Sequence, residues 1–148
     1  MRQSGPTASV VLAGTGETNS SADSYYGLGI LRSIDGGKSW TLISQDISGS
    51  RSFAGLGFSQ IAFSTANPNL AVAGAGSASE GIVENLENPV AVNRGIYYST
   101  DAGATWRLAS VTDQNGAVTS ASVTSVAYNA AAKMFYAAIR FHGFYWSP

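Results

Sequence analysis

The chain has 148 residues, of which 45% are hydrophobic and 11% charged, and its eight Lys and Arg nearly balance its nine Asp and Glu. This composition supplies a core, which argues against disorder, and it lacks the basic excess with which nucleic-acid binders neutralise phosphates. Cysteine is absent, which excludes disulfides and thiolate metal sites, and no apolar run approaches the length of a membrane span.

Short apolar segments bounded by Gly, Asn and Pro predict strands along the whole chain. They lie at 9–14, 28–33, 39–44, 58–64, 70–75, 95–99, 105–111, 122–128, 134–139 and 143–147. Longer polar loops are predicted at 15–27, 45–57, 76–94, 112–121 and 140–143, and tight turns at 65–69 and 129–133. A helical turn is expected at most within 79–88.

An octapeptide occurs twice, as Ser-Ile-Asp-Gly-Gly-Lys-Ser-Trp at 33–40 and as Ser-Thr-Asp-Ala-Gly-Ala-Thr-Trp at 99–106. The Asp carboxylate can accept backbone N–H groups of a tight turn, Gly tolerates a positive φ, and Trp opens the next strand with a large apolar surface to bury. We therefore expect a hairpin turn with a structural role, formed by Ser33, Asp35, Gly37, Ser39 and Trp40 and again by Ser99, Asp101, Gly103, Thr105 and Trp106. A third copy begins at Ser147.

The octapeptide resembles the Asp-box, or BNR, motif of sialidases, the sortilin luminal domain, xyloglucan-specific endoglucanases and a photosystem II assembly factor. The resemblance implies an all-β fold, in which the motif is the turn between the third and fourth strands of a β-propeller blade. It also implies that the usual ligand site lies on the opposite face. Such a motif specifies a fold and not one activity.

The repeat spacing predicts one partial propeller domain over 1–148. Ser99 follows Ser33 by 66 positions and Ser147 follows Ser99 by 48, against about 40–50 residues for a typical propeller repeat. The predicted strands form about two and a half blades, at 9–45 (partial), 58–111 and 122–148 (partial). Because a closed ring needs about four to eight blades, we expect a piece of a larger propeller. A β-sandwich, or copies that self-associate through open blade edges, are the alternatives.

If the Asp-box turns define one face, the long loops lie on the other, where function is generally expected. The first candidate group on that face contains Glu17, Asn19, Asp23, Tyr25 and Tyr26. Its tyrosine rings could stack on a sugar and its carboxylates could bond the sugar hydroxyls. A carboxylate pair is also what glycoside hydrolysis requires. Alternatively, the acids cap turns and the tyrosines pack on the blade. The loop has no recognisable Ca²⁺ pattern, so we expect no metal.

Two further groups contain charged residues. Arg94, Arg140 and His142 should lie near strand ends on the loop face, where they could receive an anionic ligand, or His142 could simply bond a neighbouring loop. A single histidine excludes a His-based metal cluster or hydrolase triad within the chain. The third group, Glu80, Glu84 and Glu87, is either a solvated face or a set of carboxylates that approaches the first group.

The resemblance favours a non-catalytic binding module of an exported bacterial protein, which engages carbohydrate or protein through its loop face. Extracellular or periplasmic location follows from the resemblance alone, since residues 1–6 show no apolar signal segment. A glycoside hydrolase resembling the xyloglucan-specific endoglucanases and a protein-assembly scaffold are the alternatives. No cofactor, nucleic acid or membrane span is expected.

Overall fold

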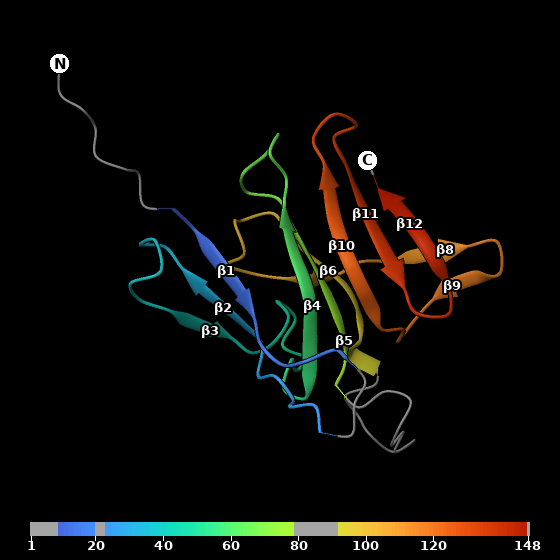
Figure 1. Cartoon of the computed structure of the whole chain (residues 1–148), viewed down its shortest axis with the longest axis horizontal. Coiled ribbons are helices and arrows are strands. Elements are labelled where there is room, and N and C mark those ends of the chain that lie inside the picture. Colours follow the sequence, from blue (N-terminus) through green and yellow to red (C-terminus); the bar gives the residue numbers. More distant parts are fainter. Residues whose placement is uncertain (1–8, 20–22, 79–91, 148) are drawn as a thin grey trace.

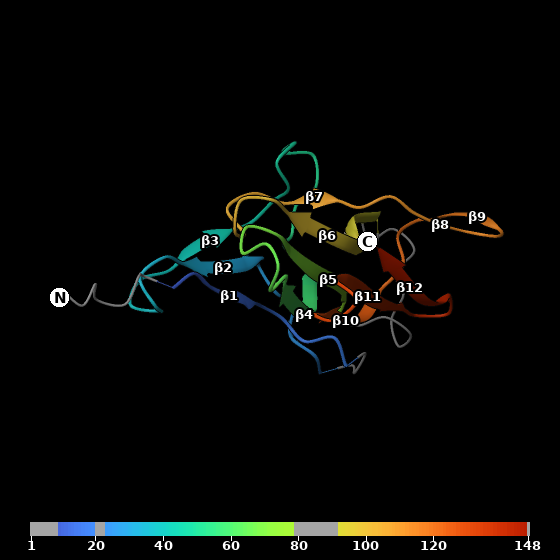
Figure 2. The same cartoon turned by 90° about the horizontal axis from the view of Figure 1, so that it is seen from above.

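The computed structural model describes residues 9–19, 23–78 and 92–147, and this part of the chain is all-β (Figure 1). Three antiparallel sheets lie in a row, and a two-stranded hairpin stands beside them (Figures 1 and 2). The first sheet contains β1 (Val11–Gly14), β2 (Ile30–Ser33) and β3 (Thr41–Ile43). The second contains β4 (Leu56–Phe63), β5 (Ala71–Ser77), β6 (Gly95–Ser99) and β7 (Arg107–Leu108). The third contains β10 (Val123–Asn129), β11 (Met134–Ile139) and β12 (Gly143–Ser147), and the hairpin joins β8 (Val111–Asp113) to β9 (Gly116–Val118).

Strand register shows that the three sheets are copies of one unit. The serine that opens each octapeptide pairs with the equivalent position of the preceding strand, as Ser33↔Val11, Ser99↔Ala71 and Ser147↔Phe135. Within the described residues, the first sheet has no counterpart of β4 and the third has none of β7. The arrangement confirms the predicted all-β fold and is consistent with a β-propeller fragment whose ring is not closed.

The core consists of two layers of side chains between neighbouring sheets. The layer between the first and second sheets contains Trp106, Tyr97 and Phe53, all fully buried. Rings of Phe53 and Tyr97 meet edge to face with centroids 5.0 Å apart, a favoured aromatic geometry. The layer between the second and third sheets is formed by Val72, Val123, Val126, Phe135, Ala137 and Ile139.

Strand β5 is small enough to be packed on both faces. Its sequence Ala-Val-Ala-Gly-Ala-Gly-Ser is buried except at its last residue. A Cβ at Gly74 would lie 2.7 Å from Cγ1 of Val123, so only glycine allows β10 to approach this closely. The predicted strand at 70–75 is thus the centre of the molecule, buried on both sides as its composition indicates.

The connections divide between two edges of the sheets. One edge carries the Asp-box turn at 34–40 and the turns at 64–70 and 130–133 (Figure 1); the second Asp-box joins it, because the amide of Ala102 donates to the carbonyl of Asn69 at 2.8 Å. We call it the Asp-box edge. The opposite edge, called the loop edge, carries 15–19, 23–29, 44–55 and 140–142. This division matches the predicted alternation of turns and loops.

Two predicted segments differ from the structure. The strand expected at 105–111 is interrupted, because β7 contains only Arg107 and Leu108 before the chain leaves the sheet. The loop expected at 112–121 instead contains most of the β8–β9 hairpin, closed by the turn at Gln114–Asn115. There the Asn115 amide donates to Asp113 Oδ1 at 2.7 Å, and Gly116, the first residue of β9, has φ +117°. The helical turn expected within 79–88 lies outside the described residues. In the described part, no helix is long and apolar enough to cross a membrane.

Candidate functional site

The two Asp-box turns have the same hydrogen bonds. Ser33 Oγ donates to Asp35 Oδ1 at 2.7 Å and accepts the amide of Gly37 at 2.8 Å. Asp35 also accepts the amide and hydroxyl of Ser39, at 2.9 and 2.7 Å. In the second copy, Ser99, Asp101, Gly103 and Thr105 form equivalent bonds of 2.6–2.8 Å. The carboxylate therefore ties together its own turn, as predicted.

These hydrogen bonds lower the pKa of both carboxyl groups. For Asp35 the main cause is the hydroxyl of Ser39, followed by the amide of the same residue and the hydroxyl of Ser33. Burial by itself raises the pKa of Asp101, but bonds from Thr105 and Ser99 together outweigh it, and the net direction is down. Both groups are therefore carboxylates at neutral pH and poor proton donors, which supports a structural role.

The tryptophans of the two motifs differ in their surroundings. Each indole N–H donates to the carbonyl of the motif glycine, at 3.0 Å from Trp40 and 3.1 Å from Trp106. Trp106 is fully buried between the first and second sheets, whereas Trp40 is 43% exposed. Both tryptophans were expected to be buried under their turns. This is confirmed for Trp106, whereas Trp40 is only partly buried, because no described sheet packs on that side of the first sheet.

At the loop edge, the described residues of the 15–29 loop, 15–19 and 23–29, are anchored by Thr15. Its hydroxyl accepts the amides of Leu28 and Gly29 at 2.9 and 3.0 Å and donates to the carbonyl of Gly29 at 2.7 Å. Further out, the Glu17 amide donates to the carbonyl of Tyr25 at 3.0 Å. The hydrogen bonds of Thr15 thus join the two ends of the loop where the chain leaves and re-enters the sheet.

The predicted first group lies on this loop. The Ser24 hydroxyl donates to Asn19 Oδ1 at 2.7 Å, so Asn19 has a structural bond. The side chains of Tyr25 and Tyr26 are 78% and 53% exposed, so the tyrosines do not pack over the blade as the structural alternative required. The loop places Glu17 beside Tyr25 through their backbone bond, and it holds Asp23 on the same segment.

A cavity of about 720 Å³ lies beside the same edge. It is lined by residues 46–51, by the start of β6, by β7 and by the β8–β9 hairpin. The charged residues in its described lining are three arginines and one aspartate: Arg51, Arg94, Arg107 and Asp46. Ile96, Leu108, Val111 and Val118 supply apolar walls. A cavity of this size lies within the range of small-molecule sites.

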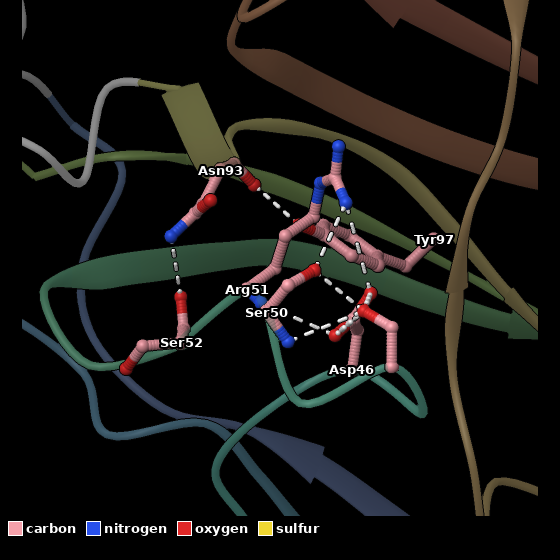
Figure 3. Close-up of polar contacts among 7 residues, drawn as sticks. Asp46, Ser50, Arg51, Ser52, Asn93 and Tyr97 are labelled. Carbon is pink, nitrogen blue, oxygen red and sulfur yellow. Dashed lines mark hydrogen bonds and ion pairs between the residues drawn. The ribbon is translucent and has the colours of Figure 1, made fainter.

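The loop at 44–55 connects this cavity to the first candidate loop. The Gly27 amide donates to the carbonyl of Leu56 at 2.8 Å, and the Gly55 amide donates to the carbonyl of Gly27 at 2.9 Å. Toward the cavity, Asn93 Nδ2 donates to the carbonyl of Ser52 at 3.1 Å (Figure 3). Residues 44–55 therefore hold the 15–29 loop on one side and the start of β6 on the other.

Asp46 organises the wall of the cavity (Figure 3). Its carboxylate accepts the hydroxyl of Ser48 at 2.7 and 2.8 Å and the amide of Arg51 at 3.2 Å, and its side chain is 5% exposed. The Arg51 guanidinium lies further away, with Nη1 3.9 Å from Asp46 Oδ2 and 3.5 Å from Ser50 Oγ. Asp46 is thus satisfied mainly by its own loop.

The Nε–H of Arg51 is buried and has no hydrogen-bond partner in the described structure. An unmade bond at a buried donor costs about 1–3 kcal/mol, so this Nε–H lowers the stability of the loop. Behind it, the Tyr97 hydroxyl donates to the carbonyl of Asn93 at 2.6 Å. Burial raises the pKa of Tyr97 to about 12, so it is a neutral donor.

The remaining predicted residues lie elsewhere on the loop edge. Of the eight predicted ligand residues, only Arg94 lines this cavity. Arg140 and His142 share the tight turn between β11 and β12, where the His142 amide donates to the carbonyl of Ile139 at 3.1 Å. The Arg140 guanidinium lies 5.0 Å from the centroid of the Phe141 ring, a cation–π distance. Glu80, Glu84 and Glu87 lie outside the described residues.

Sequence reasoning did not single out Asp46, Arg51 or Arg107. The usable signal was Asp46-Ile47-Ser48, an Asp followed two residues later by Ser in a Gly-rich segment, which is typical of a side-chain-capped turn. Nothing in the sequence alone indicates that this turn meets β6 and β7. As for metals, the described residues contain no group of three His, Cys, Asp or Glu side chains that could hold an ion.

Comparison with known proteins supports the repeat. Residues 97–108, which comprise most of β6, the second Asp-box turn and β7, match the family model of the BNR/Asp-box repeat. No curated protein matches the chain. The chain therefore contains a BNR/Asp-box repeat, a unit found in carbohydrate-related proteins, within an all-β structure of repeated antiparallel sheets.

Proposed function

We propose that this protein is a non-catalytic binding module that takes a carbohydrate ligand on its loop edge. The observation that carries the proposal is the exposure of Tyr25 and Tyr26, 78% and 53%, on a loop clamped to the sheets by Thr15 and Leu56. Aromatic side chains held in water by such a loop provide flat apolar surfaces with a polar hydroxyl, which suits a sugar ring. Glu17 and Asp23 on the same loop supply acceptors for its hydroxyl groups.

The cavity favours binding over hydrolysis. Glycoside hydrolysis generally uses two carboxyl groups that flank the scissile bond, and among the described residues that line this cavity Asp46 alone has one. That carboxylate is 5% exposed and already accepts the Ser48 hydroxyl and the Arg51 amide. A hydrolase resembling the xyloglucan-specific endoglucanases remains the second candidate, because Glu17 and Asp23 share one loop. An enzyme would release reducing sugar from xyloglucan, whereas a binding module would not.

We further propose that the module belongs to an exported bacterial protein and meets its ligand outside the cytoplasm. The support is the BNR/Asp-box repeat together with the resemblance to exported members of that group. A protein partner on the loop edge is the alternative to a glycan, and a pull-down in which no glycan competes would favour it.

Affinity gel electrophoresis against a panel of soluble polysaccharides tests the carbohydrate proposal. We expect retardation of the native chain by at least one glycan, and a loss of about tenfold in affinity, equal to about 1.4 kcal/mol, when Tyr25→Ala and Tyr26→Ala are combined. Ile34→Ala is the matched control, because Ile34 is 58% exposed on the Asp-box edge and should leave binding unchanged. Equal retardation of both variants would contradict the proposal.

A further inference from the structure

We propose that a second cavity, between the second and third sheets, binds the tryptophan of an extended peptide that adds to β12 as a further strand. The described residues of the 15–29 loop do not line this cavity, so the inference is independent of the proposed carbohydrate function. Its basis is internal repetition, because the equivalent place between the first and second sheets is filled by Trp106, directly before β7.

The second cavity has a volume of about 500 Å³, within the range of roughly 300–1,000 Å³ that is usual for ligand sites. Its walls come from β6, from residues 109–112 and from β11 and β12. No residue of its described lining is charged, and five of them are aromatic: Tyr98, Phe135, Tyr136, Tyr145 and Trp146. These walls suit a large, neutral, apolar side chain.

Strand register maps this cavity onto the surroundings of Trp106. Aligning Ser99 with Ser33, and Ser147 with Ser99, pairs each strand position with its counterpart in the next sheet. Five residues belong to or pack against the core layer that contains Trp106: Leu12, Ile30, Ala71, Ala73 and Tyr97. Their counterparts all line the cavity: Val72, Ile96, Phe135, Ala137 and Tyr145. The cavity is therefore the third-sheet equivalent of the Trp106 site.

The edge of β12 offers the backbone groups that a further strand would bond. Its counterpart β6 pairs with β7, and the amide of Ala109 donates to the carbonyl of Ile96 at 2.8 Å. The residue equivalent to Ile96 is Phe144 of β12, a strand that pairs within the described residues with β11 alone (Figure 1). In strand addition, main-chain bonds along such an edge give affinity, and a pocket for a side chain gives specificity.

The occupant that fits is an extended segment of another protein that contains a tryptophan. A second folded copy does not supply one from its described residues, because Trp40 and Trp106 adjoin strands that are already paired and Trp146 lies within β12 itself. The indole N–H groups of Trp40 and Trp106 also bond within their own turns. The partner is thus recognised by an indole ring on a strand that is unpaired before binding.

The test uses the full chain and a labelled peptide with the sequence of residues 100–109, Thr-Asp-Ala-Gly-Ala-Thr-Trp-Arg-Leu-Ala. Fluorescence anisotropy should show saturable binding, and the peptide with Trp106→Ala should bind at least about tenfold more weakly. Equal affinity of the two peptides, or binding of neither, would overturn the inference.

A protein variant locates the site. Val111 lines the second cavity and packs against the core layer between the second and third sheets, so Val111→Trp places the chain's own indole there and should abolish peptide binding. Val118→Trp is the matched control, because Val118 pairs with Val111 across the β8–β9 hairpin but lines only the cavity beside the loop edge. Circular dichroism checks that both variants fold, and equal peptide affinities of the two would contradict the location.

A disulfide test keeps the inference falsifiable even if Val111→Trp does not fold. The chain has no cysteine, and Trp146 is the counterpart of Tyr98, which pairs with Arg107. Opposite residues on antiparallel strands have Cα atoms about 4.5–5.5 Å apart, a distance that a disulfide can span. The peptide with Arg107→Cys should therefore cross-link to Trp146→Cys at least about tenfold faster than to Phe144→Cys, two residues away.

Equal cross-linking rates of those two protein variants would overturn strand addition in this register. The variant with Tyr25→Ala and Tyr26→Ala should bind the peptide as the native chain does, because the described residues of that loop do not line the cavity. Failure of this inference and failure of the proposed carbohydrate function are therefore distinguishable.

Discussion

The two Asp-box turns separate what a motif determines from what its surroundings determine. Asp35 and Asp101 make the same bonds to serine, threonine and backbone partners within a few residues. The residues of the octapeptide alone therefore determine this hydrogen-bond geometry. The burial of the following tryptophan is not local, because Trp106 is fully buried and Trp40 is 43% exposed. Two copies of one motif can therefore make the same hydrogen bonds and still contribute differently to the stability of the fold.

This difference predicts unequal effects of tryptophan truncation. Trp106→Ala should lower the free energy of unfolding by about 3–5 kcal/mol, the usual range for removal of a large aromatic side chain from a core. Trp40→Ala should cost less than about 1.5 kcal/mol, because much of its surface is already in water. Urea denaturation monitored by circular dichroism measures both. Equal losses would show that the Asp-box bond to the indole N–H, and not burial, dominates.

The lowered pKa values of the Asp-box carboxyl groups predict acid sensitivity. Asp35 and Asp101 both have a folded-state pKa below the value of about 4 expected in the unfolded chain. The unfolded state therefore binds more protons below that value, and the stability that these groups contribute is complete above about pH 4 and lost progressively as the pH falls through the folded-state pKa. Urea midpoints measured between pH 6 and 2 should decline below pH 4.

Replacement of both carboxylates isolates their share of this decline. The variant with Asp35→Asn and Asp101→Asn should be less stable than the native chain at pH 6 and should show a shallower loss of stability between pH 4 and pH 2. A slope identical to that of the native chain would assign the acid sensitivity to other carboxyl groups.

At the scale of elements, the loop edge depends on a few clamps between loop backbones. The hydroxyl of Thr15 accepts two amides and donates to one carbonyl where the two ends of the 15–29 loop meet. Glycine is required nearby, since a Cβ at Gly27 would lie 2.4 Å from the carbonyl oxygen of Thr15 and 2.6 Å from that of Leu56. The position of the exposed tyrosines therefore follows from bonds well removed from them.

Thr15→Val tests this clamp, because it keeps the shape of the side chain and removes the hydroxyl. We expect a loss of about 1–3 kcal/mol from unpaired polar groups and faster hydrogen exchange at the amides of Leu28 and Gly29. Glycan affinity should fall as well, although Thr15 would not touch the ligand. Unchanged exchange at both amides would show that the remaining backbone bonds suffice to hold the loop.

Local sequence rules predicted some elements to the residue and missed others. Strands 95–99, 134–139 and 143–147 were predicted with the bounds of β6, β11 and β12, because a glycine or a turn marks the start of each and a short run of apolar residues follows. The β8–β9 hairpin was missed although its turn contains Asn115 and is followed by Gly116, since its two strands have only three residues each. Strand β7 is shorter than its sequence indicates because the chain turns away to form that hairpin.

The candidate site was predicted less well for a physical reason. The alternation of turns and loops placed Arg94 on the loop edge, but Arg51 joins it only because residues 44–55 fold back toward β6. The hydrogen bond that joins the two segments, from Asn93 Nδ2 to the carbonyl of Ser52, connects residues 41 positions apart. Contacts of that range depend on how sheets pack, which periodicity within one segment does not specify.

At the scale of the whole molecule, the outer face of the third sheet differs from its internal equivalents. By strand register, Phe144 of β12 corresponds to Ile30 of β2, and Tyr136 of β11 corresponds to Val72 of β5. Ile30 and Val72 are 0% and 8% exposed because the next sheet covers them, whereas Phe144 and Tyr136 are 82% and 39% exposed. The third sheet thus presents to solvent the positions that form cores elsewhere in the molecule.

This surface predicts self-association of the chain. Trp146, 68% exposed, lies on the same face of the same sheet as Phe144 and Tyr136, and each large aromatic side chain that a second copy covers removes about 150–250 Å² from water. Sedimentation velocity should therefore show a mass that rises with concentration.

The variant with Phe144→Ser and Trp146→Ser should remain monomeric, because it removes the apolar surface and leaves the backbone edge of β12 unchanged. The matched variant with Tyr25→Ser and Tyr26→Ser, which removes two aromatic side chains from the loop edge, should associate as the native chain does. If both variants associate like the native chain, pairing of open strand edges, and not burial of this aromatic face, holds the copies together.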